Sequence, residues 1–252
     1  MLSFSKFLSE ERINLGGGAK YGQVILLMGG AGSGKSTATR KYVNTRGYKV
    51  INPDDVKELI VRAADKGNPA FAEMKGVDPF SREGSQIVHR YLIKTKLGKK
   101  KMDTMLASIK LAPPDKKPNL VLDRTFSYPR EMERVVPGLI EAGYKPENIH
   151  IVFVMTDVNI AVERNRARER SIPDEIVMRT NKGARINFYR LFFKGNDATS
   201  MINGDYYVVI NRGAEIVKVK SAGQRVDTET EMAEKIRKKI GVEDKGFLPK
   251  TS

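Results

Sequence analysis

One stretch of the chain carries the residue types best suited to chemistry. Residues 24–37 read Val-Ile-Leu-Leu-Met-Gly-Gly-Ala-Gly-Ser-Gly-Lys-Ser-Thr. The spacing Gly29-x-x-x-x-Gly34-Lys35-Ser36 is that of a phosphate-binding loop, in which successive backbone N–H groups converge on one anion. Lysine supplies a mobile positive charge for the outer phosphates, and a serine hydroxyl is a hard oxygen suited to Mg²⁺. The stretch therefore predicts binding of a nucleoside triphosphate with magnesium.

The residues around this loop position it. The apolar run before the loop predicts a strand buried on both faces, and the helix after it turns its positive N-terminal end toward the same anion. We expect the nucleotide to contact every residue of the loop, namely Gly29, Gly30, Ala31, Gly32, Ser33, Gly34, Lys35, Ser36 and Thr37. Lys35 is also expected to act in catalysis, and Ser36 to bind the metal.

Acidic residues follow two further predicted strands. Asp54 and Asp55 come directly after strand 48–52, and Asp123 ends strand 119–123. Phosphoryl transfer to an alcohol needs a base for the hydroxyl proton, and we assign that role to Asp54 and the first helical turn to Asp55. Helix capping is the alternative role for this pair. Asp123 has the placement of a Walker-B acid that acts on magnesium, whereas starting a turn is its alternative role.

An arginine-rich helix is predicted over residues 160–170. Arg164 and Arg168 share one face of that helix, and Arg166 and Arg170 share another. One face is expected to pair with acids on the solvent side, and the other to clamp the triphosphate when a lid near residues 160–175 closes. The planar guanidinium suits phosphate oxygens.

Strands and helices alternate along most of the chain. Apolar runs predict strands at 24–28, 48–52, 119–123 and 149–155, and a hairpin pairs 206–210 with 215–219. Helical periodicity predicts helices at 36–46, from Asp54, and at 86–97, 102–111, 128–142, 160–170, 174–193 and 232–240, while 65–80 reads as a loop. This order indicates an α/β fold of the P-loop NTPase type, a mostly parallel sheet with helices on both faces. Ligands lie at the carboxyl ends of such strands, so Asp54 and Asp123 should meet the loop there.

Composition limits the remaining possibilities. We expect residues 1–20 to form a lead-in with a helix at 3–12 and a flexible 16–18 segment, and 21–252 to form one domain that ends in the hairpin and a helix. No cysteine is present and no apolar run approaches 18 residues, which favours a cytoplasmic protein without disulfides or membrane spans. Two widely separated histidines, His89 and His150, give no metal-ligand cluster. Magnesium held by oxygen atoms is the only metal expected.

The chain is strongly basic, with a net charge of +15. A triphosphate needs only a few cations, so the surplus favours a polyanionic partner such as DNA, although an inert basic surface is the alternative. Lysines crowd residues 94–101, which read first as a solvated helix face. The aromatic residues of 188–193 fit a core better than a base-stacking platform.

Beyond the loop, the chain resembles the zeta-toxin-like P-loop kinases, in particular their phage-encoded members. The similarity rests on residues 29–37, 49–57, 119–125, 143–154 and 165–173, and it spans roughly 20–190. The resemblance implies that Asp54 is the general base, that Arg164, Arg168 and Arg170 belong to the lid, and that ATP is the donor. Zeta toxins phosphorylate UDP-N-acetylglucosamine, whereas related phage kinases act on polynucleotides or on 5-hydroxymethyluracil in DNA.

Three functions remain open from the sequence. The basic charge favours a kinase that phosphorylates a nucleic-acid hydroxyl, with Arg124 and Thr125 lining the acceptor pocket. The alternatives are a small-molecule kinase of a nucleotide sugar or nucleotide, and a nucleotide-hydrolysing switch without an acceptor. The guanine-specific pattern Asn-Lys-x-Asp is not formed, because Asn181-Lys182-Gly183 is followed by Ala184.

Overall fold

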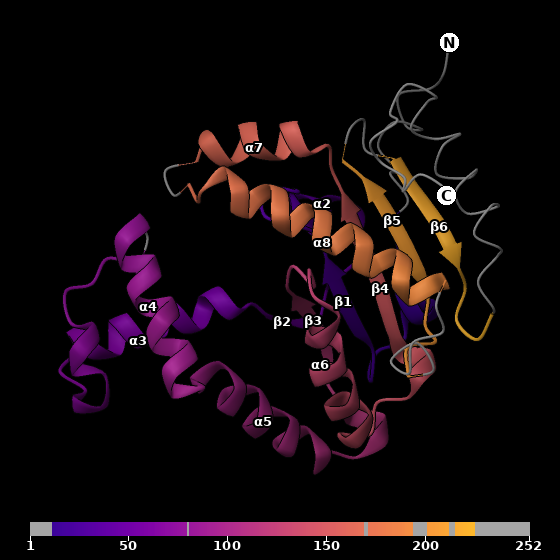
Figure 1. The fold of residues 1–252 in the computed structure, drawn as a ribbon. Coiled ribbons are helices and arrows are strands. Elements are labelled where there is room, and N and C mark those ends of the chain that lie inside the picture. The colour runs from indigo at the N-terminus through magenta and orange to yellow at the C-terminus, as the bar shows by residue number, and fades with distance from the viewer. Residues whose placement is uncertain (1–11, 80, 169–170, 194–200, 212–214, 225–252) are drawn as a thin grey trace, which may run out of the picture.

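The computed structural model describes residues 12–79, 81–168, 171–193, 201–211 and 215–224. Their strands form one six-stranded sheet in the order β2-β3-β1-β4-β5-β6 (Figure 1). All neighbours are parallel except β5 and β6, which pair antiparallel as the predicted hairpin does. The strands are β1 Val24–Met28, β2 Tyr48–Ile51, β3 Asn119–Asp123, β4 Ile149–Met155, β5 Tyr206–Ile210 and β6 Glu215–Lys220. The predicted α/β class, with a mostly parallel sheet, is confirmed.

Helices connect the parallel strands and cover both faces of the sheet (Figure 1). They are α2 Lys35–Tyr42, α3 Pro53–Asp65, α4 Arg82–Thr95, α5 Leu97–Lys110, α6 Pro129–Glu141, α7 Val158–Arg166 and α8 Asp174–Phe193. Short 3₁₀ turns lie at η1 Leu15–Gly18, η2 Pro69–Met74, η3 Pro114–Lys116 and η4 Pro146–Asn148. Among the described residues, no helix combines the length and apolar character that crossing a bilayer requires.

Alternation along β1 divides the core between the two faces. Leu26 and Met28 point to the side that α6 and α8 cover, where Phe188 is fully buried. Ile25 and Leu27 point to the opposite side, against α2. Every residue of β1 is buried, as expected for a central strand of a parallel sheet. Phe188 and Tyr189 belong to this core, so the expectation that the aromatics of 188–193 pack inside is confirmed for these two, whereas the side chains of Phe192 and Phe193 lie outside the described ones.

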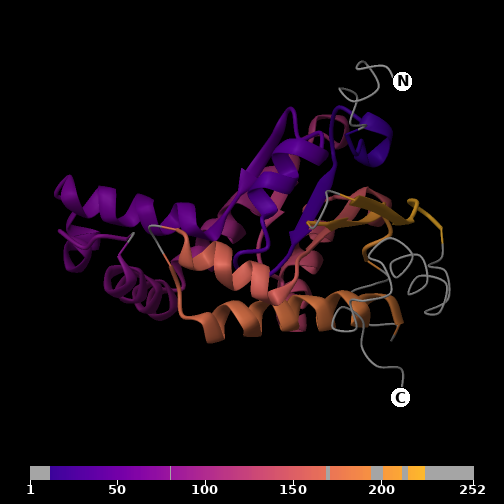
Figure 2. The same cartoon turned by 90° about the horizontal axis from the view of Figure 1, so that it is seen from above.

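Helices α3 and α4 pack on each other beyond the edge strand β2 and carry a small core of their own (Figure 2). That core is formed by Ile60, Val61, Ala64, Met74 and Val88. The predicted loop at 65–80 contains η2, whose Met74 contributes to this core. The lysines of the 94–101 run are exposed where α4 meets α5, as expected for a solvated face.

Two helices, α2 and α7, end four residues earlier than predicted. Helix α2 stops at Tyr42 instead of continuing to residue 46, because Ile13 pairs with Val43 and its N–H donates to the Tyr42 carbonyl at 2.7 Å. Helix α7 stops at Arg166, because the Asn165 side chain bonds both the N–H and the carbonyl of Ile172 and turns the chain back. Tertiary hydrogen bonds replace helical ones at both ends.

The lead-in is more ordered than predicted. The glycine segment at 16–18 forms part of η1, and its Gly16 N–H donates to the Asp205 carboxylate at 3.1 Å. The predicted helices at 3–12 and 232–240 lie outside the described residues, apart from Arg12, as does Arg170.

Candidate active site

The phosphate-binding loop lies between β1 and α2, at the carboxyl ends of the strands. Its Gly32 has φ +73 and its Gly34 φ +84, values that L side chains rarely adopt. A Cβ on Gly32 would meet the Ala161 carbonyl of α7, so the loop also has no room for a larger residue. The Lys35 ammonium donates to the Gly29 carbonyl at 2.8 Å and lies across the loop. The backbone thus forms a cradle with the lysine at its mouth.

Residues far away in the sequence hold this cradle. The Asn181 amide of α8 donates to the Ala31 carbonyl at 2.8 Å, and the Ala31 N–H donates to Thr180 Oγ1 at 3.1 Å. On the other side, the Asn211 amide donates to the Ser33 carbonyl at 2.7 Å. The sequence did not predict a role for Thr180, Asn181 or Asn211 in holding the loop. No local pattern could reveal them, since each pairs with the loop across a large sequence separation.

Lys35 faces the acid at the end of β3. Its Nζ lies 3.9 Å from Asp123 Oδ1, and the two side chains are only 14% and 12% exposed. Burial lowers the pKa of Lys35, and the charges of Asp123 and Asp54 partly oppose that effect. Burial raises the pKa of Asp123, which Lys35 lowers and the charges of Asp54 and Asp55 raise further. The structure therefore places Asp123 beside Lys35 of the loop, and Asp54 follows the carboxyl end of the next strand, β2.

Asp54 lies in the first turn of α3 but does not cap it. Asn52 is the capping residue, and its side-chain oxygen accepts from the Asp54 N–H at 2.9 Å. The Asp54 carboxylate is 55% exposed and lies 2.8 Å from the Lys57 ammonium. Burial lowers the pKa of His89 on α4, the charge of Lys57 lowers it further, and the charge of Asp54 raises it. His89 therefore lies within reach of both charges. Asp54 is thus an accessible carboxylate whose charge acts on Lys35 and Asp123.

The residues present suit a magnesium ion that is partly held by the nucleotide. Ser36 lies in the exposed first turn of α2 beside Lys35, and Asp123 is a buried carboxylate with acidic neighbours. Within the described residues, no group of three His, Cys, Asp or Glu side chains forms a complete metal site. Magnesium commonly uses one or two protein ligands with phosphate oxygens and water, which this donor set permits.

The arginines of the predicted lid separate into two kinds. Arg164 Nη1 is buried without a hydrogen-bond partner among the described residues, and lies 3.4 Å from the position of a Cβ on Gly34. Arg168 follows α7, is exposed, and its charge contributes to lowering the pKa of Lys35, mainly an effect of burial. Arg166 instead bonds the Asp174 carboxylate through its Nε at 3.0 Å. Arg164 and Arg168 therefore face the cradle, and Arg166 faces α8.

Two opposite charges, Arg124 and Glu131, influence each other beyond the end of β3. Burial lowers the pKa of Arg124, and the charge of Glu131 raises it. Burial also raises the pKa of Glu131, while Arg124, the Phe126 N–H and Lys35 lower it. The sequence did not single out Glu131, because an acidic residue in the first turn of a helix such as α6 is common and stabilises the helix dipole. Arg124 Nε is buried without a partner among the described residues.

Comparison with known proteins identifies relatives of this arrangement. A family profile described as "AAA domain" matches residues 24–189, more than half of the chain. No curated protein sequence matches. The AvrRxo1-ORF1:ORF2 complex is similar in structure, with a TM-score of 0.57 and 16% identity over 90% of this chain in its native form. With ATP bound, the TM-score is 0.52 and the identity 18% over 86% of this chain.

The similar chain is longer than this one. This chain covers 66% of the AvrRxo1 chain in the native complex and 63% in the complex with ATP. The PezAT toxin–antitoxin system of Streptococcus pneumoniae matches with a TM-score of 0.48 and 14% identity, over 94% of this chain and 91% of that one.

Proposed function

Because the chain belongs to the AAA domain family, we propose that it is an ATP- and magnesium-dependent kinase that transfers the γ-phosphate to a hydroxyl group of nucleic acid. The observation that carries the proposal is the convergence of Lys35, Asp123 and Asp54 at one end of the sheet. ATP is favoured as the donor because the similar AvrRxo1 complex was determined with ATP. The resemblance to zeta-toxin-like kinases supports the same reaction.

Each residue has a defined part in the transfer. The loop 29–37 binds the phosphates, Lys35 stabilises the outer ones, and Arg164 and Arg168 offset the charge that develops in the transition state. Magnesium, held by Ser36 and Asp123, would supply further neutralisation of phosphate charge. Asp54 accepts the proton of the acceptor hydroxyl while the oxygen of that hydroxyl forms a bond to the γ-phosphorus. The bond from the γ-phosphorus to the bridging oxygen breaks, and ADP leaves.

Nucleic acid is the acceptor class that the charge favours. The chain carries +15 overall, and the exposed lysines of the 94–101 run lie near the start of α5. A polyanion gains affinity from such a surface by counterion release. The proposed acceptor is the hydroxyl of 5-hydroxymethyluracil in phage DNA, which would have to leave the base stack, or the 5′ end of a polynucleotide.

The rival candidate is a kinase of a small molecule such as UDP-N-acetylglucosamine. The resemblance to zeta toxins supports it, since Asp54 and the lid arginines would serve this reaction as well as transfer to nucleic acid. A switch that only hydrolyses ATP is the remaining alternative. The exposed carboxylate of Asp54 favours an acceptor over water alone, because an accessible base can meet a bulky substrate.

Transfer of labelled γ-phosphate tests the three functions together. The full chain is incubated with ATP and magnesium and, in separate reactions, hydroxymethyluracil DNA, unmodified DNA with a free 5′ end, or UDP-N-acetylglucosamine. We expect label on one of the DNAs, and loss of transfer in Asp54→Asn. Label on the nucleotide sugar alone would establish the rival, and free phosphate alone would establish the switch. Full transfer by Asp54→Asn would reject Asp54 as the base.

A further inference from the structure

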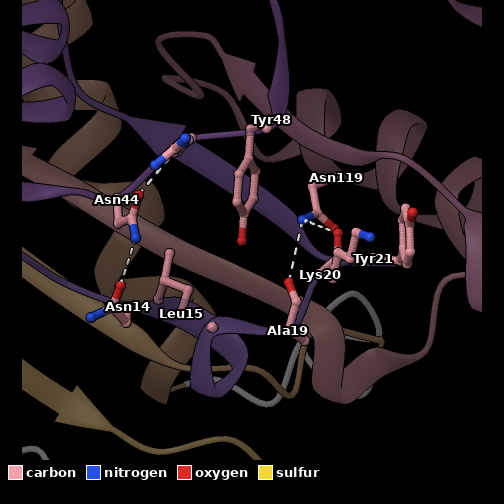
Figure 3. A pocket seen from close by; sticks show the side chains of 11 residues that line it. Asn14, Leu15, Ala19, Lys20, Tyr21, Asn44, Tyr48 and Asn119 are labelled. Carbon is pink, nitrogen blue, oxygen red and sulfur yellow. Dashed lines mark hydrogen bonds between the residues drawn. The ribbon is translucent and has the colours of Figure 1, made fainter.

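A second concave site lies at the opposite end of the sheet. A pocket of about 270 Å³ opens where β2 and β3 begin, at Tyr48 and Asn119, whereas the phosphate-binding loop follows the carboxyl end of β1 (Figure 3). Its walls come from residues 14–21, from the turn 44–47 and from the first residues of these two strands. None of these residues takes part in the active site described above.

The charged groups of this pocket are both cationic. Lys20 and Arg46 line it, and no aspartate or glutamate does. Within the described residues neither cation forms an ion pair, and Lys20 Nζ lies 5.2 Å from the centre of the Tyr21 ring. Two cations without acids favour an anion, and a guanidinium suits phosphate oxygens. The ligand of this pocket should therefore carry negative charge.

The asparagine side chains that line the pocket form hydrogen bonds within its walls. Asn119 is committed to the wall, because its oxygen accepts from the Gln23 N–H and its amide donates to the Ala19 and Lys20 carbonyls. The Asn44 amide donates to the Asn14 oxygen at 2.9 Å, and the Asn44 oxygen accepts from the Arg46 N–H at 3.3 Å, so these side chains bond one another and the turn. The cations Lys20 and Arg46 are therefore the groups of this pocket that are complementary to an acceptor-rich ligand.

An aromatic ring crosses the pocket. The Tyr48 ring stands between the Asn14–Asn44 side and the Asn119 side, with its hydroxyl directed into the space (Figure 3). That hydroxyl has no hydrogen-bond partner among the described residues, and burial raises the pKa of Tyr48 to about 12, so it remains a donor at neutral pH. Tyr21 adds a second ring at the rim, 42% exposed. Aromatic rings beside cations are the combination that binds a base together with its phosphate.

We propose that this pocket is a second nucleotide-binding site, in which Arg46 and Lys20 hold a phosphate and Tyr48 contacts the base. The nucleotide is either free or one unit of a nucleic-acid strand. A strand has a route from here to the active site, because β2 is an edge strand whose exposed Lys49 and Val50 lead from Tyr48 toward Asp54. Four residues of β2 span about 13 Å, a distance that a few nucleotides can bridge.

Binding to matched charge variants tests the pocket. The test pair is the double variant Lys20→Gln with Arg46→Gln against Lys66→Gln with Lys75→Gln, which removes the same charge from exposed sites after α3 and η2. The probes are fluorescein-labelled (dT)₁₀ and unlabelled dTMP, measured by anisotropy with saturating ADP and magnesium in the active site. We expect Kd for (dT)₁₀ to rise at least tenfold in the pocket variant and less than twofold in the control.

A second variant addresses the base. Tyr48→Phe retains the ring but removes the hydroxyl donor, and we expect a two- to fivefold rise in Kd with an unchanged melting temperature. Competition by dTMP supports a free nucleotide as the ligand, whereas binding of (dT)₁₀ without such competition supports a strand. Equal weakening in the pocket and control variants, or no binding of either probe, overturns the proposal.

The outcome is separable from that of the kinase proposal. Phosphoryl transfer is measured on the same preparations, and the pocket variant should retain the wild-type kcat on a saturating acceptor. Loss of transfer to every acceptor, with binding at the pocket intact, would reject the kinase proposal and leave the second site standing.

Discussion

The two ends of the parallel sheet bury polar groups in opposite ways. At the carboxyl end, Ser33 Oγ, Arg124 Nε and Arg164 Nη1 are buried without hydrogen-bond partners among the described residues. At the amino end, the fully buried His150 bonds Gln23 Oε1 through Nε2 at 2.8 Å, and its Nδ1 accepts from the Asp205 N–H at 2.8 Å. The groups at the carboxyl end are left unsatisfied, whereas those of the His150–Asp205 network at the amino end are satisfied.

This difference indicates that a ligand binds at the carboxyl end, where the buried polar groups lack partners. An unsatisfied buried polar group costs about 1–3 kcal/mol, which a bound phosphate can recover by accepting its hydrogen bond. The satisfied network at the amino end instead anchors the chain, because Asp205 also accepts from the N–H groups of Gly16 and Ala222. Substitutions at the carboxyl end should therefore reduce activity, and those in the amino-end network should reduce stability.

Lys35→Ala should have the largest effect. It removes the ammonium that stabilises the outer phosphates, and turnover should fall about 10³-fold, measured as transfer of labelled phosphate. The melting temperature should not fall, because the ammonium is largely desolvated at 14% exposure. Lys41→Ala on the exposed side of α2 is the control and should stay within twofold. If Lys35→Ala kept its turnover within tenfold of wild type, the assignment of the active site to this end of the sheet would be rejected.

Arg164→Ala and Arg166→Ala sharpen the comparison within one helix. Arg164 has the unsatisfied Nη1 beside Gly34, so its loss should lower kcat/KM about 10²-fold with little change in stability. Arg166 is paired with Asp174 at the surface, so its loss should leave activity within twofold and change stability little. Steady-state kinetics and urea unfolding measure both effects. Equal losses of kcat/KM in the two variants would contradict the idea that the ion pair with Asp174 keeps Arg166 out of the active site.

The sequence predicted the strands and the place of the two acids at the carboxyl ends of β2 and β3. Long apolar runs such as 149–155 can form little else than buried strands, and parallel topology brings their carboxyl ends together. It could not reveal Asn181, whose polar side chain in a helical pattern has no local signal of its contact with Ala31. The early end of α7 was equally hidden, since it depends on the Asn165 side chain reaching Ile172.

Asp205→Asn should reduce stability rather than activity. Burial alone would raise the pKa of Asp205, but the His150 ring and the Gly16 and Ala222 N–H groups lower it to about 2. A carboxylate with a lowered pKa adds stability that is fully present above its unfolded pKa of about 4 and is lost as the pH falls through 2. At pH 7 the variant should lose about 2 kcal/mol of unfolding free energy.

Urea unfolding at several pH values measures this effect. The difference between wild type and Asp205→Asn should be constant from pH 7 to 5 and should shrink between pH 4 and 2. Phosphoryl transfer at 20 °C should remain within twofold of wild type. A difference that grows as the pH falls would contradict the lowered pKa.

Asn181→Ala and Asn119→Ala compare two buried asparagines, one at each end of the sheet. Both are 5% exposed and hydrogen-bonded, so both variants should lose about 1–3 kcal/mol of unfolding free energy. Only Asn181 holds the phosphate-binding loop, through the Ala31 carbonyl, so only its loss should weaken ATP binding, by about fivefold. Isothermal titration with ATP and magnesium measures that affinity. Equal weakening in Asn119→Ala would mean that the two ends of the sheet are coupled through β3, whose first residue is Asn119 and whose last is Asp123.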